Sequence, residues 1–478
     1  MKLPTNPPSL RALMRSRLAI ARDRWVPARG LGVLFAWIVL ATALRVDAPA
    51  SEAPTAAPAA PRIPEERWVA MRFGRLVEAS GRVVQNAVIV VRNDRIHAVG
   101  GPDTPIPANA AYVDLSRLTA IPGLIDVHTH LTYYWDLHDT ARPWEQLIAR
   151  LPAVTVFLAQ ENARKTLEVG VTTVRDLGSF DHMDIALRDL IQRGAMFGPR
   201  MFVAGYGLQI TDELPKQSKG TLDSGRADGP AEVMRVVRQQ VAAGADWIKM
   251  YGSTGSGDDV SGQQTFTYDE MKAAVDAAHN LGKKIAIHSY GASGARDAVR
   301  AGADSVEHAV DLDDATLQEM VRRRIYYVPT IDHNRYYMEN AAGFGYTATA
   351  VERMKSFLAR NLQTTRRAHQ LGVRIAMGSD AVMTMCGQNT RELAWFVQAG
   401  MTPLAALATA TTSAASLLGK EKVLGSLAPG YMADIVAVEG DPATDVRSVI
   451  YGVRWVMKGG VVMVSRLNEE KNQLRMMD

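Results

Sequence analysis

The ten residues Ile121-Pro-Gly-Leu-Ile-Asp-Val-His-Thr-His130 decide the fold of this 478-residue chain. An apolar run with a Pro-Gly pair near its start leads directly into two histidines. The run predicts a buried strand over 119–126. The i, i+2 spacing of His128 and His130 puts both imidazoles on the same side of that strand. Two neutral imidazoles aimed at one point are a natural site for a divalent cation.

Seven more short apolar runs follow this stretch, and amphipathic segments with helical spacing lie between them. We expect strands at 119–126, 171–176, 201–205, 245–250, 284–288, 304–308, 326–330 and 374–379. Eight strand–helix units predict an α/β fold with a parallel sheet, and eight is the number that closes a (β/α)8 TIM barrel. A doubly wound open sheet is the alternative. The fingerprint G-x-G-x-x-G of dinucleotide binding follows none of these strands.

Short alternating runs of apolar and polar residues flank the barrel region on both sides. They predict β-strands, and we expect the two parts to pair into one small, discontinuous β-sandwich domain. The predicted organisation is a leader and linker at 1–62, the first part of the β-sandwich at 63–118, the barrel at 119–420, the second part of the β-sandwich at 421–466, and a tail at 467–478.

The leader differs in composition from the rest of the chain. Seven Lys or Arg and one Asp occur in the first 29 residues, and residues 31–44 carry no charge. This pattern is typical of a secretory signal peptide, and an Ala/Pro-rich linker follows it. The apolar run is shorter than the ~20 residues of a spanning helix. We therefore expect an exported protein, periplasmic or secreted, with an uncleaved membrane anchor as the alternative.

The leader also explains the net charge of the chain, which is +4 from 54 Lys and Arg against 50 Asp and Glu. Without residues 1–43, 47 bases (54 less 7) face 49 acids (50 less 1), a formal charge of −2. Nucleic-acid binding therefore loses its electrostatic support. The single cysteine excludes an internal disulfide framework and any Cys-rich metal site.

Six side chains suited to metal chemistry fall at the carboxyl ends of predicted strands. They are His128, His130, Lys249, His288, His308 and Asp380. In a closed barrel these ends meet at one mouth, where active sites are built, so we predict a divalent metal site there. The remaining histidines are interpreted as hydrogen-bonded structural residues; they are His97, His138, His182, His279, His333 and His369.

Lys249 requires its own interpretation, because an ammonium group cannot coordinate a metal. Burial lowers the pKa of a lysine. The neutral amine can then add carbon dioxide to form a carbamate, which is a carboxylate able to bridge two metals. The alternative is a salt-bridged lysine whose ammonium group reaches solvent.

The stretch 121–130 closely resembles the opening motif of the metal-dependent amidohydrolase superfamily, and so does the order HxH, Lys, His, His, Asp. The resemblance covers about residues 65–466. The sequences ADWIKM (245–250), HSYG (288–291), SVEHA (305–309) and GSDA (378–381) look most similar to the prolidase and Xaa-Arg/Lys dipeptidase branch. Ochratoxin-degrading amidohydrolases are similar in the same way.

This resemblance implies a centre of two divalent metal ions, expected to be Zn²⁺. His128, His130 and Asp380 would hold one ion, His288 and His308 the other, and carboxylated Lys249 and a hydroxide would bridge them. The implied reaction is hydrolysis of an amide or peptide bond to an amino acid with a free carboxylate. The substrate would be a dipeptide or an N-acyl amino acid, with ochratoxin-like compounds among the candidates. Asp380 would pass the proton of the hydroxide to the leaving amine.

Three other functions remain as alternatives. Hydrolysis of a cyclic imide, lactam or hydantoin would use the same two-metal centre. Deamination of a nucleobase is disfavoured, because Gly291 stands where an H-x-x-E motif requires Glu. A non-catalytic barrel would be expected to lack ligands, and none is missing.

Two further residues are candidates for substrate binding. Tyr290 occupies an H-x-Y position similar to that of the dipeptidase branch and would donate to the oxyanion or to a substrate carboxylate. Arg296 is a candidate clamp for that carboxylate. The alternatives are core packing for Tyr290 and a solvated position for Arg296. Cys386 stands where relatives tend to have histidine; we expect it at the substrate mouth but not as a nucleophile. We also expect a homo-oligomer.

Overall fold

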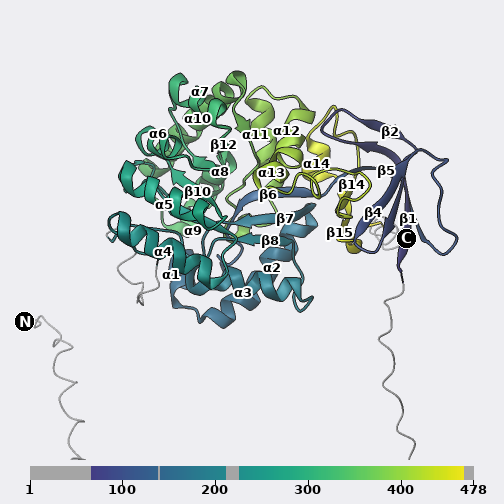
Figure 1. The fold of residues 1–478 in the computed structure, drawn as a ribbon, viewed down its shortest axis with the longest axis horizontal. Helices are drawn as coiled ribbons and strands as arrows, with labels where there is room; N and C mark the ends of the chain where they lie inside the picture. Colours follow the sequence, from purple (N-terminus) through teal and green to yellow (C-terminus); the bar gives the residue numbers. More distant parts are fainter. Residues whose placement is uncertain (1–65, 138–139, 212–224, 468–478) are drawn as a thin grey trace, which may run out of the picture. The chain divides into compact units, whose positions relative to one another are not determined.

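The computed structural model describes residues 66–137, 140–211 and 225–467. The predicted leader and linker, residues 468–478 of the tail, and His138 lie outside this part of the chain. Figure 1 shows the barrel with its surrounding helices, and the longer strands from both ends of the described chain lying together beside it. Within the described ranges, no helix combines the length and the apolar character needed to cross a membrane.

Eight parallel strands build the barrel. They are β6 (Leu124–Thr129), β7 (Val171–Asp176), β8 (Arg200–Val203), β9 (Trp247–Tyr251), β10 (Lys284–Ser289), β11 (Ser305–His308), β12 (Tyr326–Val328) and β13 (Arg374–Ile375). They pair as β6-β7-β8 and as β9-β10-β11-β12-β13. Parallel bridges join the two sets on both sides, because Leu208 pairs with Met250 and Thr129 pairs with Ala381. The barrel predicted from the sequence is confirmed.

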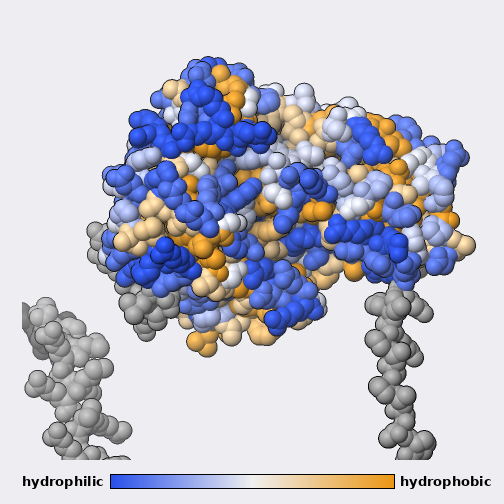
Figure 2. Space-filling view, in the orientation of Figure 1, coloured by the Kyte–Doolittle hydropathy of each residue, from blue (hydrophilic) through white to orange (hydrophobic). Residues whose placement is uncertain are grey.

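Helices follow the strands and cover the outside of the barrel. The longer ones are α2 (Pro152–Glu168), α3 (Met183–Gln192), α4 (Pro230–Ala243), α5 (Tyr268–Asn280), α6 (Ala292–Ala301), α7 (Asp314–Arg323), α8 (Ile331–Glu339) and α10 (Ala348–Leu371). The shorter ones are α1 (Pro143–Ala149), α9 (Ala341–Phe344), α11 (Glu392–Gln398), α12 (Pro403–Thr409), α13 (Thr412–Leu417) and α14 (Arg447–Tyr451). Most of their apolar residues are buried, although Phe157 on α2 is 72% exposed. The face in Figure 2 is largely hydrophilic over the outer helices, with separate hydrophobic patches.

The first barrel strand begins later than the sequence predicts. Residues 119–122 end β5 (Ala111–Pro122) of the neighbouring sheet, and Gly123 separates β5 from β6. A Cβ atom on Gly123 would lie 2.3 Å from Thr172 Oγ1 and 2.8 Å from Asp434 Cβ. Only glycine allows this close approach. The prediction of one strand over 119–126 was wrong, because the Pro-Gly pair marks a change of sheet.

Strands from both ends of the described chain form the second sheet. They are β1 (Trp68–Val77), β2 (Val83–Gln85), β3 (Val88–Arg92), β4 (Arg95–Gly100), β5, β14 (Ile435–Val438), β15 (Val453–Lys458) and β16 (Val461–Ser465). The order is β16-β15-β14-β5-β1-β3-β4, with β2 on β1. This is one mixed sheet, and a bridge from Arg95 to Met432 ties β4 to the segment before β14. The pairing of β5 with β14 joins the two parts, as the sequence predicts.

Trp455 lies in the core of this second sheet, where 2% of its surface is exposed. We predict that Trp455→Ala lowers the free energy of unfolding by about 3–5 kcal/mol, because the substitution leaves a cavity that the sheet cannot fill. Thermal unfolding followed by calorimetry measures the loss. Tyr451→Ala is the control, since Tyr451 is 66% exposed and its replacement should cost within about 0.5 kcal/mol. Equal losses in the two variants would contradict this placement.

Candidate metal centre

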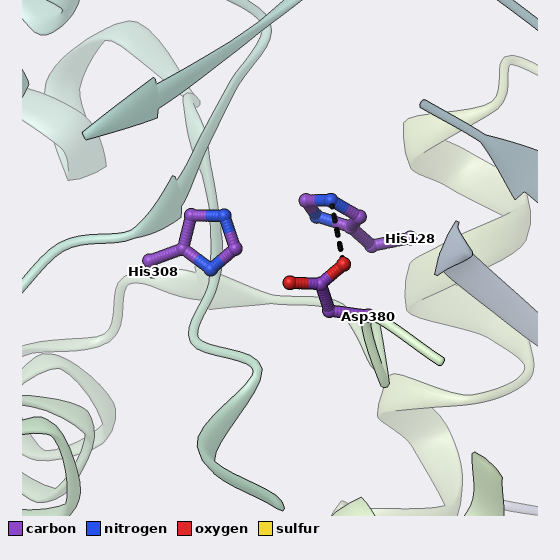
Figure 3. Close-up of side chains that lie close together, drawn as sticks. All are labelled: His128, His308 and Asp380. Carbon is purple, nitrogen blue, oxygen red and sulfur yellow. Dashed lines mark ion pairs between the residues drawn. The ribbon is translucent and has the colours of Figure 1, made fainter. Parts of the chain in front are cut away.

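The ends of the strands bring four histidines and one aspartate around one space. His128 lies in β6, His130 directly follows it, His288 lies in β10 and His308 ends β11. The ring centroid of His308 lies 5.0 Å from that of His128 and 4.4 Å from that of His288. Oδ1 of Asp380 lies 3.5 Å from His128 Nε2 and 3.2 Å from His130 Nε2. The potential ligand atoms of His128, His308 and Asp380 all lie within 4.8 Å of one another (Figure 3).

Lys249 reaches the same space from β9. Its Nζ lies 3.4 Å from His128 Nε2, and 1% of the residue is exposed. In the described part of the chain, no carboxylate forms an ion pair with Lys249. Burial lowers the pKa of Lys249 to about 8. The alternative of a salt-bridged, solvated lysine therefore does not describe this structure. We call the following six residues the cluster: His128, His130, Lys249, His288, His308 and Asp380.

Two histidines of the cluster present Nε2 to the central space because Nδ1 is engaged elsewhere. Nδ1 of His130 lies 2.9 Å from the carbonyl oxygen of Gly178, which only accepts, so Nδ1 carries the proton. Nδ1 of His128 lies 2.8 Å from Oε2 of Glu307. A carboxylate also accepts, which leaves the Nε2 lone pair of both rings free for a cation.

The other two histidines are equally suited to bind a cation. Nδ1 of His308 lies 2.6 Å from Oγ1 of Thr330. That hydroxyl donates its proton to the carbonyl oxygen of Pro329, so it accepts from His308 and leaves Nε2 free. Nε2 of His288 is buried and, within the described residues, has no hydrogen-bond partner. A buried polar atom without a partner is costly, and a metal ion would satisfy this one.

The protonation states of three of the four rings also favour metal binding. Burial lowers the pKa of His128, His288 and His308 well below the usual value, and neighbouring positive groups, Lys249 among them, lower it further. These rings are therefore neutral, which is the form that coordinates metals. At His130, burial opposes protonation, but contact with Asp380 outweighs burial and raises the pKa.

Three residues at the strand ends have a left-handed backbone. They are His308 (φ 72°), Thr330 (φ 51°) and Asp380 (φ 53°). Such conformations cost about 1–3 kcal/mol each and concentrate at functional sites. Strand alternation would place Glu307 and His308 on opposite faces of β11. Both nevertheless contact His128, because the backbone turns at His308.

Asp126 fixes the first strand to the segment that carries Asp380. Its Oδ1 accepts from the backbone N–H groups of His128 at 3.1 Å and Ser379 at 3.0 Å. Its Oδ2 accepts from the Ser379 hydroxyl and, at 2.9 Å, from the Asn389 amide. Burial raises the pKa of Asp126 to about 6. This carboxylate therefore sets the distance between the HxH pair and Asp380.

His333 contacts the cluster, whereas its place in the sequence predicts only a hydrogen-bonded structural residue. Its Nδ1 donates to the backbone oxygen of Asp380 at 2.8 Å, and its Nε2 lies 3.1 Å from Oδ2 of the same residue. That interpretation missed its place in the site. His333 lies on α8 instead of at a strand end, so the strand-end pattern carried no signal for it.

Three other candidates have different positions. Tyr290 is 1% exposed and stacks on His288, with ring centroids 5.0 Å apart. Arg296 is exposed on α6, and among the described residues no hydrogen bond or ion pair links it to the cluster. Cys386 does not line the mouth: it packs in the hydrophobic core at 3% exposure, and its Sγ lies 4.0 Å from the Ala381 carbonyl oxygen. Burial raises the pKa of its thiol, which opposes a nucleophilic role.

The barrel and the cluster at its strand ends place the protein among the α/β-barrel enzymes. The chain belongs to the amidohydrolase family, whose model matches residues 119–463.

Known proteins similar to this chain agree with this assignment. Ochratoxinase from Aspergillus niger is 29% identical over 422 residues, which cover 81% of this chain and 85% of that protein. The crystal structure of a Xaa-Pro dipeptidase with bound methionine is 31% identical, with a TM-score of 0.75, and the match covers 83% of this chain and 99% of that one. A putative prolidase from Bifidobacterium longum is 27% identical, with a TM-score of 0.70, and the match covers 86% of this chain and 98% of that one.

Family and relatives together establish a hydrolase that acts on C–N bonds of amides. Enzymes of this family usually use metal ions, and the donor set of the cluster fits such ions.

Proposed function

We propose that this protein is a binuclear amidohydrolase that cleaves the amide bond to an amino acid with a free carboxylate. Its substrate would be a dipeptide or an N-acyl amino acid. The observation that carries the proposal is Lys249, buried and without an ion-pair partner in the described chain, 3.4 Å from Nε2 of His128. The names of the similar proteins, Xaa-Pro dipeptidase, prolidase and ochratoxinase, support this substrate class.

The cluster divides into ligands for two ions. We assign His128, His130 and Asp380 to one and His288 and His308 to the other. Imidazole nitrogens and carboxylate oxygens suit Zn²⁺. The neutral Nζ of Lys249 would attack carbon dioxide and lose a proton, which would give a carbamate able to serve as a ligand to both ions. A carbamate anion at this position would avoid the cost of placing an ammonium group beside two metal ions.

The residues of this chain would carry the proton steps. Two bound divalent ions would lower the pKa of a water molecule and polarise the scissile carbonyl. Asp380 accepts the proton of that water and delivers it to the leaving nitrogen. Burial opposes its ionisation, but His333, His130 and Lys249 outweigh burial and hold the pKa of Asp380 below its usual value. Tyr290 would donate to the substrate's carbonyl oxygen or carboxylate. Arg296, which is exposed on α6, is the candidate clamp for that carboxylate.

A substrate panel with metal analysis tests this function. It includes Xaa-Pro, Xaa-Arg and Xaa-Lys dipeptides, N-acyl amino acids, hydantoins, and dipeptides with an amidated carboxyl end. We expect two metal ions per chain, hydrolysis of at least one linear class, and loss of activity when the carboxylate is amidated. Hydrolysis of hydantoins alone would favour the cyclic-amide alternative, and a fully metallated protein that cleaves no amide would contradict the proposal.

Carbon dioxide should limit assembly of the centre. We predict that metal-free protein regains activity with zinc slowly in buffer depleted of carbon dioxide and several-fold faster with added bicarbonate. The rate should rise with pH through about 8, because Lys249 is an unreactive ammonium group below its pKa and a neutral amine above it. Reactivation at several pH values measures the effect, and a rate unaffected by bicarbonate would argue against the carbamate.

We further propose that the leader directs export and that the mature chain forms a homo-oligomer. The basic stretch followed by the apolar run at 31–44 supports export. Cell fractionation with N-terminal sequencing tests the first proposal, and light scattering of the purified protein tests the second.

A further inference from the structure

A buried arginine crosses the interior of the barrel just below the cluster. Arg175, on β7, is fully buried, and its Nε donates to the backbone oxygen of Val127 at 2.5 Å. Its Nη1 donates to Ser305 Oγ at 3.0 Å and its Nη2 donates to Glu307 Oε1 at 2.9 Å. The guanidinium also lies over the ring of Trp247, 4.5 Å from the centroid. These contacts fix its orientation from four sides.

Glu307 is the residue that this arginine holds. It is fully buried, and its two oxygens have different partners. Oε1 accepts from Arg175 and Ser305, and Oε2 accepts from Nδ1 of His128 at 2.8 Å. Because Arg175 occupies Oε1 and fixes the rotation of the carboxylate, Oε2 remains directed at His128. The three residues therefore form a continuous chain from β7 through β11 to β6.

A contribution to stability does not by itself explain the ion pair between Arg175 and Glu307. A buried ion pair is often no more stabilising than apolar residues of the same volume, and both members here are fully buried. Glu307 also differs in charge from the groups that accept a hydrogen bond from Nδ1 of the other histidines. His130 donates to a carbonyl oxygen and His308 to a hydroxyl, whereas His128 donates to a carboxylate.

We infer that Glu307 and Arg175 are positioning residues that hold His128 with its proton on Nδ1 and its Nε2 lone pair directed at the metal centre. This inference rests on the proposed metal centre. A carboxylate behind a ligating imidazole fixes the tautomer and the ring orientation and makes the facing nitrogen a stronger donor. Without it, the ring is free to rotate or to carry its proton on Nε2, where it cannot bind a cation.

The test compares zinc affinity in Glu307→Gln with that of the wild type. The amide keeps the shape of the side chain but removes the charged acceptor, so we expect zinc affinity to fall about 10–100-fold. Competition with a chromophoric chelator measures the affinity without any substrate. Replacing zinc by cobalt gives a second readout, because the visible absorption of bound Co²⁺ changes when one ligand moves. Arg175→Met should weaken zinc binding as well, and Arg175→Lys should weaken it less.

Asp434→Asn is the matched control, because Asp434 is also a buried carboxylate in an ion pair, 2.6 Å from Arg200, but it does not contact the cluster. It should lose stability and keep wild-type zinc affinity. Unchanged affinity and an unchanged cobalt spectrum in Glu307→Gln would overturn the inference, and so would an equal loss of affinity in Asp434→Asn. If Glu307→Gln fails to fold, the two Arg175 variants decide by the same readouts. Failure of the wild type to bind metal would instead overturn the proposed function, and this inference with it.

Discussion

The Lys249→Ala variant is expected to bind little zinc and to hydrolyse amides on the order of 10³-fold more slowly than the wild type, or slower still. The substitution removes the proposed bridge between the two ions and leaves the four imidazoles of the cluster to face them, with Asp380 as the remaining anion. Metal analysis and kcat/KM measured on the same preparation check this result. Activity equal to that of the wild type would show that no carbamate bridge exists.

Two further substitutions separate charge from shape at this position. Lys249→Glu supplies a carboxylate without carbon dioxide, so it should recover part of the metal content and should no longer respond to bicarbonate. Lys249→Met has a similar length without charge and should behave like Lys249→Ala. If the methionine variant binds as much zinc as the glutamate variant, the bridge is not a carboxylate.

The Asp380→Asn variant should lose about 10²–10⁴-fold in kcat when assayed with saturating zinc, while KM changes little. The amide keeps the size of the side chain and its oxygen, but it cannot accept the proton of the attacking water. Steady-state kinetics in zinc-saturated buffer, with the metal content measured in parallel, give both constants. A kcat within a few-fold of the wild type would assign the proton transfer to another group.

His333→Gln provides the comparison for that result. His333 contacts Asp380 through its backbone oxygen and through Oδ2, and its loss leaves the carboxylate in place. The rate should therefore fall less in His333→Gln than in Asp380→Asn. A larger loss in His333→Gln would make His333 the principal proton carrier.

The residues at the strand ends were predictable because the carboxyl ends of all strands in a parallel barrel lie at the same end of the barrel. Each of the eight strands is a short apolar run, and the residue at its carboxyl end is necessarily near the others once the barrel closes. His128, Lys249 and Asp380 were found in this way. The prediction needed no knowledge of contacts between distant residues.

The supporting residues were not predictable, because their roles depend on contacts across the barrel. Glu307 is 179 residues from His128 and 132 residues from Arg175 in sequence. Alternation along β11 would have turned Glu307 away from His308, and only the left-handed backbone of His308 lets both side chains contact His128. Cys386 was misplaced for a related reason: its position in a loop near the mouth gave no sign that the side chain turns into the core.

Because the chain runs from β5 through Gly123 directly into β6, the barrel cannot be separated cleanly from the second sheet. A fragment trimmed to 119–420 would keep residues 119–122 but lose β1 and β14, the strands on either side of them. It would expose an unpaired, apolar strand edge shortly before the first histidine of the cluster, and such edges promote aggregation. Recombination between relatives, in the laboratory or in genomes, would therefore have to carry both ends of the gene together.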